Sequence, residues 1–421
     1  MSDLAWIDAA LTSARPQAVG ALLRYFRNLD TAEEAFQEAC LRALRSWPVN
    51  GPPRDPAAWL ILVGRNASLD EVRRGKRLET LPEDDAISDL DDVETPLAER
   101  IDDAHYRDDI LRLLFICCHP ELPATQQIAL ALRIVSGLTV KEIARAFLVS
   151  ETAMEQRITR AKRRVAQADV PFEAPGPVER AERVGAVAAM IYLLFNEGYA
   201  ASGGEVHVRA PLCEEAIRLA RLLLRLFPSE AEIMGLTALL LLQHARAAGR
   251  LDSAGAIVLL EDQDRGLWDR DLIAEGFALV EKALRHRRPG PYQLQAAIAA
   301  VHSHAARFAD TDWAEIDALY GVLARVQPSP VVTLNHAVAV SRLRGAEAAL
   351  AMIEPLEDQL AGYFYFHGVK GALLEELGRR EEARIAFDRA IALANTPAEA
   401  AHIREHLDRL SRAGEARQAS M

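Results

Sequence analysis

The stretch from Leu122 to Val165 constrains the fold more than any other part of this chain of 421 residues. Its pattern predicts one helix, a loop that begins at a glycine, and then two short helices joined by a tight turn. Thr139 and Glu142 have the Thr-x-x-Glu spacing of a capping box, which predicts that the first short helix begins here. Ser150 is a good N-cap for the second short helix, which leaves only a short turn between the two.

Two short helices joined in this way are typical of the helix-turn-helix, whose second helix enters the DNA major groove. In the predicted second helix, apolar residues share one face and basic residues lie elsewhere. From Arg133 to Arg164, eight Lys and Arg residues stand against three acids, whereas the whole chain has a net charge of −12. A basic island in an acidic protein indicates phosphate binding. The alternative is an ordinary helical hairpin with a solvated charged face.

The composition predicts an all-α protein with more than one domain. A chain of this length can form two or three domains, each with its own core. Ala, Leu, Arg and Glu dominate, and alternating β-branched runs are scarce. The N-terminus lacks the features of a signal peptide, and no apolar run is long enough to span a membrane, so we expect no membrane partner.

The sequence points to neither a metal site nor a catalytic site. Its four cysteines, Cys40, Cys117, Cys118 and Cys213, form no disulfide framework, which favours the reducing cytoplasm. Adjacent cysteines lack the two-residue spacing of zinc ligands, so we expect Cys117 and Cys118 to be buried as small apolar residues. There is no phosphate-binding glycine loop and no His-Glu-x-x-His motif. We therefore predict no enzyme activity, no metal and no cofactor.

Residues 1–78 form the first predicted domain. Thr31 is expected to cap a helix that runs to Trp47, followed by a Pro/Gly loop over 48–56 that cannot be helical. The outer face of this helix carries an acidic patch, which by its chemistry alone is an ordinary solvated surface. A further helix over 57–77 has a second basic surface, on which Asn66 and Arg73 can bond to base edges or phosphates.

The segment over 79–109 has a different composition. Between Glu83 and Asp109, twelve acidic residues stand against two arginines. Apolar residues are too few to form a core, so we expect an acidic linker between two basic modules. The predicted helix-turn-helix domain follows over 110–168.

The chain after residue 178 is helical and lacks basic stripes. Near its end a period of 34 residues predicts tetratricopeptide (TPR) helix pairs over 178–412, most clearly in the last two copies. Stacked pairs of this kind form a concave surface that holds a peptide or a protein, and the alternative is a structural domain without a ligand. The positions that recur after 34 residues are Ala337, Ala349, Ile353 and Leu356, which return as Gly371, Ala383, Phe387 and Ala390.

These motifs together resemble a bacterial extracytoplasmic-function sigma factor. The sequence LDTAEEAFQEACLRALRSW resembles region 2.2 of that family, and DPAAWLILVGRNASLDEVRRGKR resembles regions 2.3 and 2.4. The helix-turn-helix GLTVKEIARAFLVSETAMEQRITRAKRRV resembles region 4. The remaining chain, with IYLLFNEGYAASGG and QDRGLWDRDLIAEG, is similar to the subgroup that carries a C-terminal TPR-containing extension.

The resemblance implies a protein that binds core RNA polymerase and directs it to promoter DNA. Region 2.2 of the family docks on the clamp helices of the β′ subunit, which turns the acidic patch into an expected interface of Glu33, Glu34, Gln37, Glu38 and Leu41. The following helix and the loop before it would hold the −10 element. Its expected contact residues are Trp59, Arg65, Asn66, Asp70, Arg73 and Arg74.

Region 4 would read the −35 element with the exposed side of its second helix. The expected contacts are Glu151, Thr152, Glu155, Gln156, Arg157 and Arg160, with Lys162, Arg163 and Arg164 placed for phosphates. Glu155 departs from the family, in which many members have a basic or neutral residue. Two roles are open to it: it accepts a hydrogen bond from a cytosine amino group, or it only weakens the affinity.

Two other functions compete with this interpretation. A helix-turn-helix transcriptional regulator with a TPR sensor would bind an operator without acting as a sigma subunit, but it would not need the first basic module. A TPR adaptor with solubilising basic helices would bind neither DNA nor polymerase. For a sigma factor, the long C-terminal part suggests a built-in regulatory or partner-binding module.

Overall fold

The computed structural model describes residues 5–51, 53–74, 103–147, 149–167, 177–199, 209–252, 255–394 and 396–418. Its elements are helices, apart from one isolated bridge between Leu251 and Ile257. The predicted all-α class is therefore confirmed over these residues. The chain divides into two compact units, Met1–Ile191 and Tyr192–Met421. In the part of the chain described, no helix is long and apolar enough to cross a membrane.

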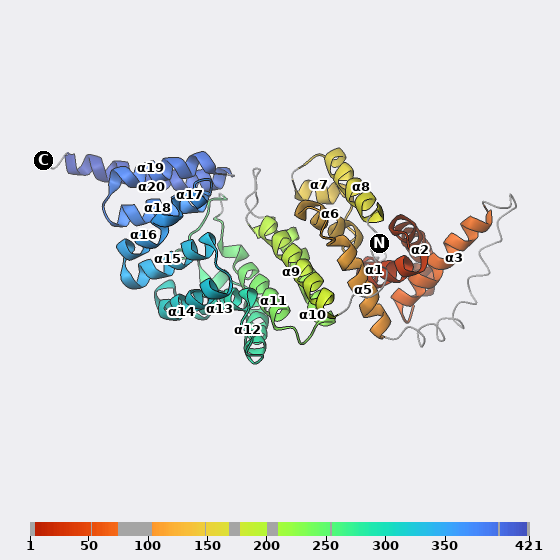
Figure 1. Ribbon diagram of the computed structural model, residues 1–421. Helices are drawn as coiled ribbons and strands as arrows, with labels where there is room; N and C mark the ends of the chain where they lie inside the picture. The colour runs from red at the N-terminus through yellow and green to blue at the C-terminus, as the bar shows by residue number, and fades with distance from the viewer. Residues whose placement is uncertain are drawn as a thin grey trace. The chain divides into compact units, whose positions relative to one another are not determined.

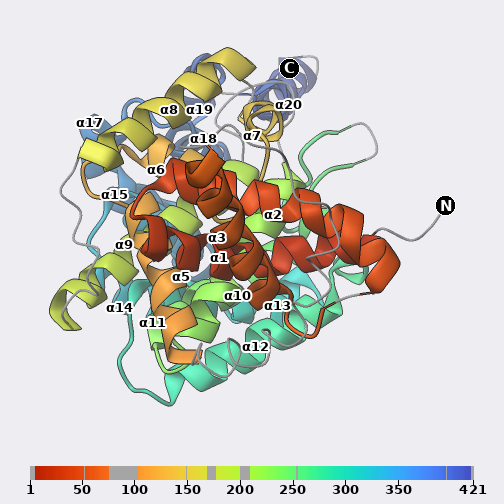
Figure 2. The same cartoon turned by 90° about the vertical axis from the view of Figure 1, so that its right-hand side faces the viewer.

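The first unit begins with a bundle of the helices α1 (Ala5–Phe26), α2 (Leu29–Asn50) and α3 (Pro56–Arg74), with α5 (Asp103–Cys117) packed on α1 (Figures 1 and 2). Tryptophan rings hold its core together. The Trp47 ring lies 6.1 Å from that of Trp6 in a stacked arrangement and 5.4 Å from that of Trp59 in an edge-on one. Such aromatic contacts add to the free energy of apolar burial.

The ends of α2 differ from the prediction. The N-cap is Asn28, whose side chain accepts a hydrogen bond from the backbone N–H of Thr31 at 3.0 Å, so the helix begins earlier than expected. At the other end α2 continues through Pro48 to Asn50. Because Pro48 lies in the last turn, it costs one backbone hydrogen bond without stopping the helix. Gly51, at a φ of +83°, closes the turn by donating to the carbonyl of Trp47.

The acidic linker ends earlier than predicted. Residues 103–109 of the predicted linker belong to α5, and its other residues, 79–102, lie outside the described residues. Asp109 is 1% exposed and pairs with Arg112 at 3.0 Å and with Arg24 at 3.4 Å. The count of acidic residues predicts an unfolded segment here, but α1 and α5 supply the positive charges that allow this carboxylate to be buried.

The predicted helix-turn-helix is formed by α6 (Ala124–Ile134), α7 (Val140–Ala146) and α8 (Glu151–Gln167). The capping box is confirmed, since Thr139 N donates to the Glu142 carboxylate at 2.7 Å and Glu142 N donates to the Thr139 hydroxyl at 3.1 Å. Ser150 caps α8 as predicted, by accepting from the N–H of Ala153 at 3.2 Å. Gly137 follows α6 with a φ of +77°, a conformation that L side chains rarely adopt.

Helix α9 (Pro177–Tyr199) contains the point at which the chain divides into its two units. The second unit continues as a series of helices, in which each contacts the next along the chain (Figure 1). The main ones are α10 (Ala210–Leu226), α11 (Ala231–His244), α12 (Arg270–Leu284), α13 (Pro291–His304), α14 (Trp313–Val326), α15 (Pro330–Arg344), α16 (Ala346–Ile353), α18 (Phe364–Glu376), α19 (Arg380–Leu393) and α20 (Pro397–Gln418).

The positions that recur after 34 residues occupy corresponding helices. Ala337 lies on α15 and its counterpart Gly371 on α18, while Ala349 on α16 corresponds to Ala383 on α19. All four are buried, and a Cβ atom at Gly371 would lie 2.5 Å from the Phe387 ring. Small residues are needed here because the paired helices approach closely. The TPR assignment of this unit remains a prediction.

Candidate DNA and polymerase interfaces

Helix α8 separates its apolar and polar residues cleanly. Its buried side packs against α6 and α7 through Met154, Ile158, Ala161 and Val165. The other side carries the residues predicted to contact DNA. Glu151, Thr152, Glu155, Gln156, Arg160 and Arg163 are exposed, and Arg157 and Lys162 are half-buried. One side of α8 is thus anchored in the domain and the other is open to a ligand.

The basic residues of α8 differ in their partners within the chain. Arg157, Arg160 and Arg163 make no hydrogen bond or ion pair with any described residue, so their guanidinium groups are available to a ligand. Arg164 instead donates to the carbonyl of Glu121 at 3.1 Å. Lys162 is also engaged, with its ammonium group 2.7 Å from Asp30 and 2.6 Å from Glu33 of α2.

Glu33 is the centre of a charged network that joins α1, α2, α6 and α8. Its side chain is 5% exposed and lies 3.2 Å from Arg15, 3.7 Å from Arg133 and 2.6 Å from Lys162. Arg15 also donates to the backbone carbonyl of Ile134 at 2.9 Å. Burial lowers the pKa of Arg15. Burial also lowers the pKa of Lys162, but its hydrogen bonds to Asp30 and Glu33 outweigh this effect and raise the value overall.

The predicted polymerase-binding residues do not all lie on one face. Glu34, Gln37, Glu38 and Leu41 are exposed on α2, and Leu41 is 53% exposed. Glu38 forms a surface ion pair with Arg42 at 3.1 Å. Glu33, by contrast, is buried in the charged network. It is not part of the exposed surface of α2 in this structure, because three cations from other helices cover its carboxylate.

The residues predicted to contact the −10 element also differ in their exposure. Arg65 and Asn66 are exposed on α3, with the Arg65 guanidinium 4.4 Å from the centre of the Tyr25 ring. Trp59 is only 7% exposed and packs against Trp47, so in this structure its side chain belongs to the core of the bundle. Asp70, Arg73 and Arg74 belong to α3, but their side chains lie outside the described residues.

Both basic helical modules of the first unit match known protein families. Residues 11–78 match the model of sigma-70 region 2, and residues 112–165 match that of sigma-70 region 4. The chain therefore contains both sigma-70 regions, which indicates a sigma factor. Residues 183–284 of this sigma factor match a family of unknown function (DUF6596). An uncharacterized protein of Rhizobium meliloti (strain 1021) is 69% identical over 411 residues, which are 98% of this chain and 97% of that protein.

The region 2 match covers most of α1 together with α2 and α3, and the region 4 match covers the C-terminal end of α5 together with α6, α7 and nearly all of α8. Sigma factors direct transcription initiation by binding core RNA polymerase and promoter DNA, and they are not enzymes. Cys117 and Cys118 are buried, as predicted, and burial raises the pKa of the Cys118 thiol to about 12. The described residues contain no cluster of ligands that could hold a metal ion.

Sequence reasoning missed the network around Glu33. Arg15 lies on a helix that shows no basic stripe, and its carbonyl partner is 119 positions away in the chain. The neighbours of Arg15 in the chain include Thr12, Ser13 and Gln17, so nothing in the local sequence marks it for burial or identifies a partner. The contacts between regions 2 and 4 could therefore not be derived from local patterns.

Proposed function

We propose that this protein is an extracytoplasmic-function sigma factor whose C-terminal unit regulates it or binds a partner. Promoter binding is supported chiefly by three arginines of α8 that have no partner among the described residues, Arg157, Arg160 and Arg163. Arg157 and Arg160 lie on the open side of the second helix of the helix-turn-helix, where base edges are read. Arg163 is placed one turn further along, where a phosphate contact would fix the register.

Core polymerase binds, in this proposal, to the exposed face of α2. Glu34, Gln37, Glu38 and Leu41 combine acidic groups with an exposed leucine, which suits a basic and partly apolar partner surface such as the β′ clamp helices. Glu33 can contribute only if its ion pairs with Arg15 and Lys162 are broken. We therefore assign the main contacts to the other four residues.

The −10 element binds along α3. Arg65 and Asn66 are exposed in the same segment, and Asp70, Arg73 and Arg74 follow on the same helix. Flipping a base out of the duplex costs a few kcal/mol. Polar groups of α3 beside the polar loop before it can offset this cost, while the buried Trp59 holds the helix against the bundle.

The C-terminal unit is, in this proposal, a TPR-like module that receives a peptide or protein. The support is the burial of small residues at positions 34 apart, on successive helix pairs. Stacked pairs of this kind expose a concave surface suited to such a ligand. Promoter-directed transcription by the full chain, compared with that by a chain ending at Pro171, tests whether this unit controls activity. Equal transcription by both in every condition would leave it without a regulatory role.

The sigma function is tested by reconstitution. The purified chain is added to core RNA polymerase with a sheared genomic DNA library, and the 5′ ends of the transcripts are sequenced. We expect start sites that share two sequence elements at a constant spacing, and no such starts with core polymerase alone. Transcripts without a common motif, or no increase over core polymerase, would contradict the proposal.

A matched pair of variants tests the polymerase surface. Leu41→Asp places a charge on the exposed face of α2 and should weaken binding to core polymerase. Leu377→Asp is the control, because Leu377 is 37% exposed in the second unit and lies outside both sigma regions. Equal affinities of the two variants for core polymerase would rule out α2 as the docking surface.

A further inference from the structure

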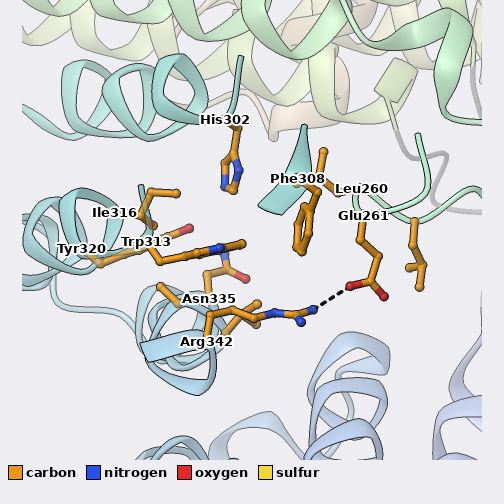
Figure 3. A pocket seen from close by; sticks show the side chains of 12 residues that line it. Leu260, Glu261, His302, Phe308, Trp313, Ile316, Tyr320, Asn335 and Arg342 are labelled. Atoms are coloured by element: carbon orange, nitrogen blue, oxygen red, sulfur yellow. Dashed lines mark hydrogen bonds and ion pairs between the residues drawn. The ribbon is translucent and has the colours of Figure 1, made fainter. Parts of the chain in front are cut away.

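The second unit contains a pocket that none of the sigma functions uses. It has a volume of about 310 Å³ and lies between the end of α13, the 3₁₀ turn Phe308–Asp310, α14, α15 and the segment 259–261. Figure 3 shows His302 and Phe308 pointing toward the indole of Trp313, with Arg342 approaching from another side. The volume is in the range of sites for small organic molecules.

The walls of the pocket are largely aromatic. The Trp313 ring lies 5.3 Å from His302 and 5.4 Å from Phe308, both in edge-to-face arrangements. Tyr320 and Ile316 of α14 complete the same wall. Rings held in this way present flat faces and edges to the pocket, which favours a planar aromatic ligand. An apolar cavity of about 150 Å³ is enough for benzene, so this pocket has room for a larger or substituted ring system.

Positive charge is concentrated behind His302. Arg265 is 7% exposed and donates to the backbone carbonyls of His302 and Ala305, while its second amino group has no partner. Arg246 bonds to the side-chain amides of Gln243 and Gln263. Neither guanidinium is bonded to a carboxylate among the described residues. Buried cations without counter-ions are costly, and a bound anion nearby would reduce that cost.

The groups near these arginines do not cancel their charge. His302 is neutral at pH 7, because burial and the two guanidinium groups lower its pKa to about 4. Its Nδ1 atom is buried without a hydrogen-bond partner. Asp310 acts to raise the pKa of Arg265, but it also forms an ion pair with Arg307 at 2.8 Å, and burial lowers the pKa of Arg265 overall. The potential at the inner end of the pocket is therefore positive.

The rim supplies a cation that can contact a ligand directly. Arg342 lines the pocket, lies 5.1 Å from the centre of the Phe308 ring, and bonds to Glu261 through one amino group at 2.8 Å. Its other guanidinium donors have no partner among the described residues. The side chains of both rim residues are more than one-third exposed, so the ion pair can rearrange at little cost.

We propose that this pocket binds a small aromatic carboxylate, with its ring packed against the wall that Trp313 and Phe308 form and its carboxylate on Arg342. The aromatic walls select the ring, and the excess of positive charge selects the anion over an uncharged compound of the same shape. Glu261 competes with the carboxylate for Arg342. This inference does not depend on the proposed sigma function, because it concerns binding to the second unit alone.

The test compares two probes of equal shape, 2-naphthoate and uncharged 2-naphthamide, by calorimetric titration of the full chain. We expect one naphthoate per chain and a naphthamide affinity about ten-fold lower, the value of one hydrogen bond to a charged group. Arg342→Gln should remove this preference, and Glu261→Gln should strengthen naphthoate binding. Arg325→Gln is the matched control, because Arg325 is exposed on α14 and does not line the pocket.

Location is tested by filling the pocket. Val338→Phe places a ring where the ligand would lie and should abolish binding of both probes, with folding checked by the melting temperature. Failure of naphthoate to bind up to its solubility limit would overturn the proposal. So would equal affinity for the two probes, or unchanged binding to folded Val338→Phe. If Val338→Phe does not fold, the other two variants test the proposal. Arg342→Gln should weaken naphthoate binding and Glu261→Gln should strengthen it, and absence of these opposite effects would overturn the proposal.

Discussion

The ammonium group of Lys162 lies 2.6 Å from the carboxylate of Glu33, although 129 residues separate the two in the chain. Lys162 belongs to the second helix of the helix-turn-helix in region 4, and Glu33 to the first turns of α2 in region 2. From the sequence, Lys162 is expected to contact a DNA phosphate and Glu33 to contact core RNA polymerase. While the pair is intact, neither group is free to contact one, and together they join regions 2 and 4 of one unit.

Removing Glu33 should cost more stability than removing Lys162. Glu33→Gln leaves Arg15, which is 8% exposed, without its carboxylate, and loss of a buried partner costs about 3 kcal/mol. Lys162→Gln leaves Glu33 paired with Arg15 and should cost about 1 kcal/mol. Native-state hydrogen exchange of the backbone amides in α1 and α2 measures the loss of stability in each variant. The control is Glu38→Gln, which breaks only a surface pair with Arg42; an equal effect of the two Glu→Gln changes would contradict the central role of Glu33 in the network.

Base reading by α8 should depend on its unpartnered arginines. Arg157→Ala and Arg160→Ala should each weaken binding of the holoenzyme to the −35 element by about 1–3 kcal/mol if a base contact is lost. Arg163→Ala should instead reduce the affinity of the holoenzyme for all DNA sequences alike. It should also reduce the slope of log affinity against log salt concentration by about one, because one phosphate contact is lost. Arg325→Ala in the second unit serves as control. Wild-type transcription by both base-reading variants would refute the assignment of α8.

Acid should destabilise the second unit through His302. Its pKa in the folded chain is about 4, below the ordinary value of 6.5. The unfolded chain therefore binds more protons between these two values, so stability is full above pH 6.5 and falls as the pH is lowered toward 4. The total loss from this group is roughly 3 kcal/mol.

Urea unfolding of the wild type and His302→Gln at several pH values measures this contribution. Burial also lowers the pKa of His244 and His402, so the wild-type slope contains them as well. The difference between the two proteins isolates His302. Parallel slopes between pH 6.5 and pH 4 would show that His302 does not titrate as described.

Two helical glycines should respond to alanine with opposite signs. A Cβ atom at Gly235 in α11 would lie 2.6 Å from the backbone nitrogen of Gln293, so Gly235→Ala should destabilise the second unit by about 1–3 kcal/mol. Gly321 in α14 has no atom within 4 Å of the same position. Gly321→Ala should stabilise by up to about 1 kcal/mol, because alanine favours helix. The melting temperatures give both values, and a change of the same sign would be inconsistent with this packing.

Local sequence determined the helical elements of this protein and the ends of several of them. The capping box at Thr139 and Glu142, the cap at Ser150 and the buried side of α8 all depend on groups within a few residues of one another. Such interactions form in any helix that contains them. The same patterns, together with the family resemblance, led to regions 2 and 4 of a sigma factor.

Only the tertiary structure decided which polar residues are open to a partner. Glu33 and Glu34 are adjacent in sequence and equally acidic, yet one is covered by cations from three other helices and the other is exposed. Trp59, expected at a DNA surface, fills a core, and Asp109, expected in a linker, is buried beside arginines. The pocket around Trp313 likewise combines segments that share no sequence motif. Burial and ion pairing depend on residues far apart in the chain, whereas helix formation depends on near neighbours.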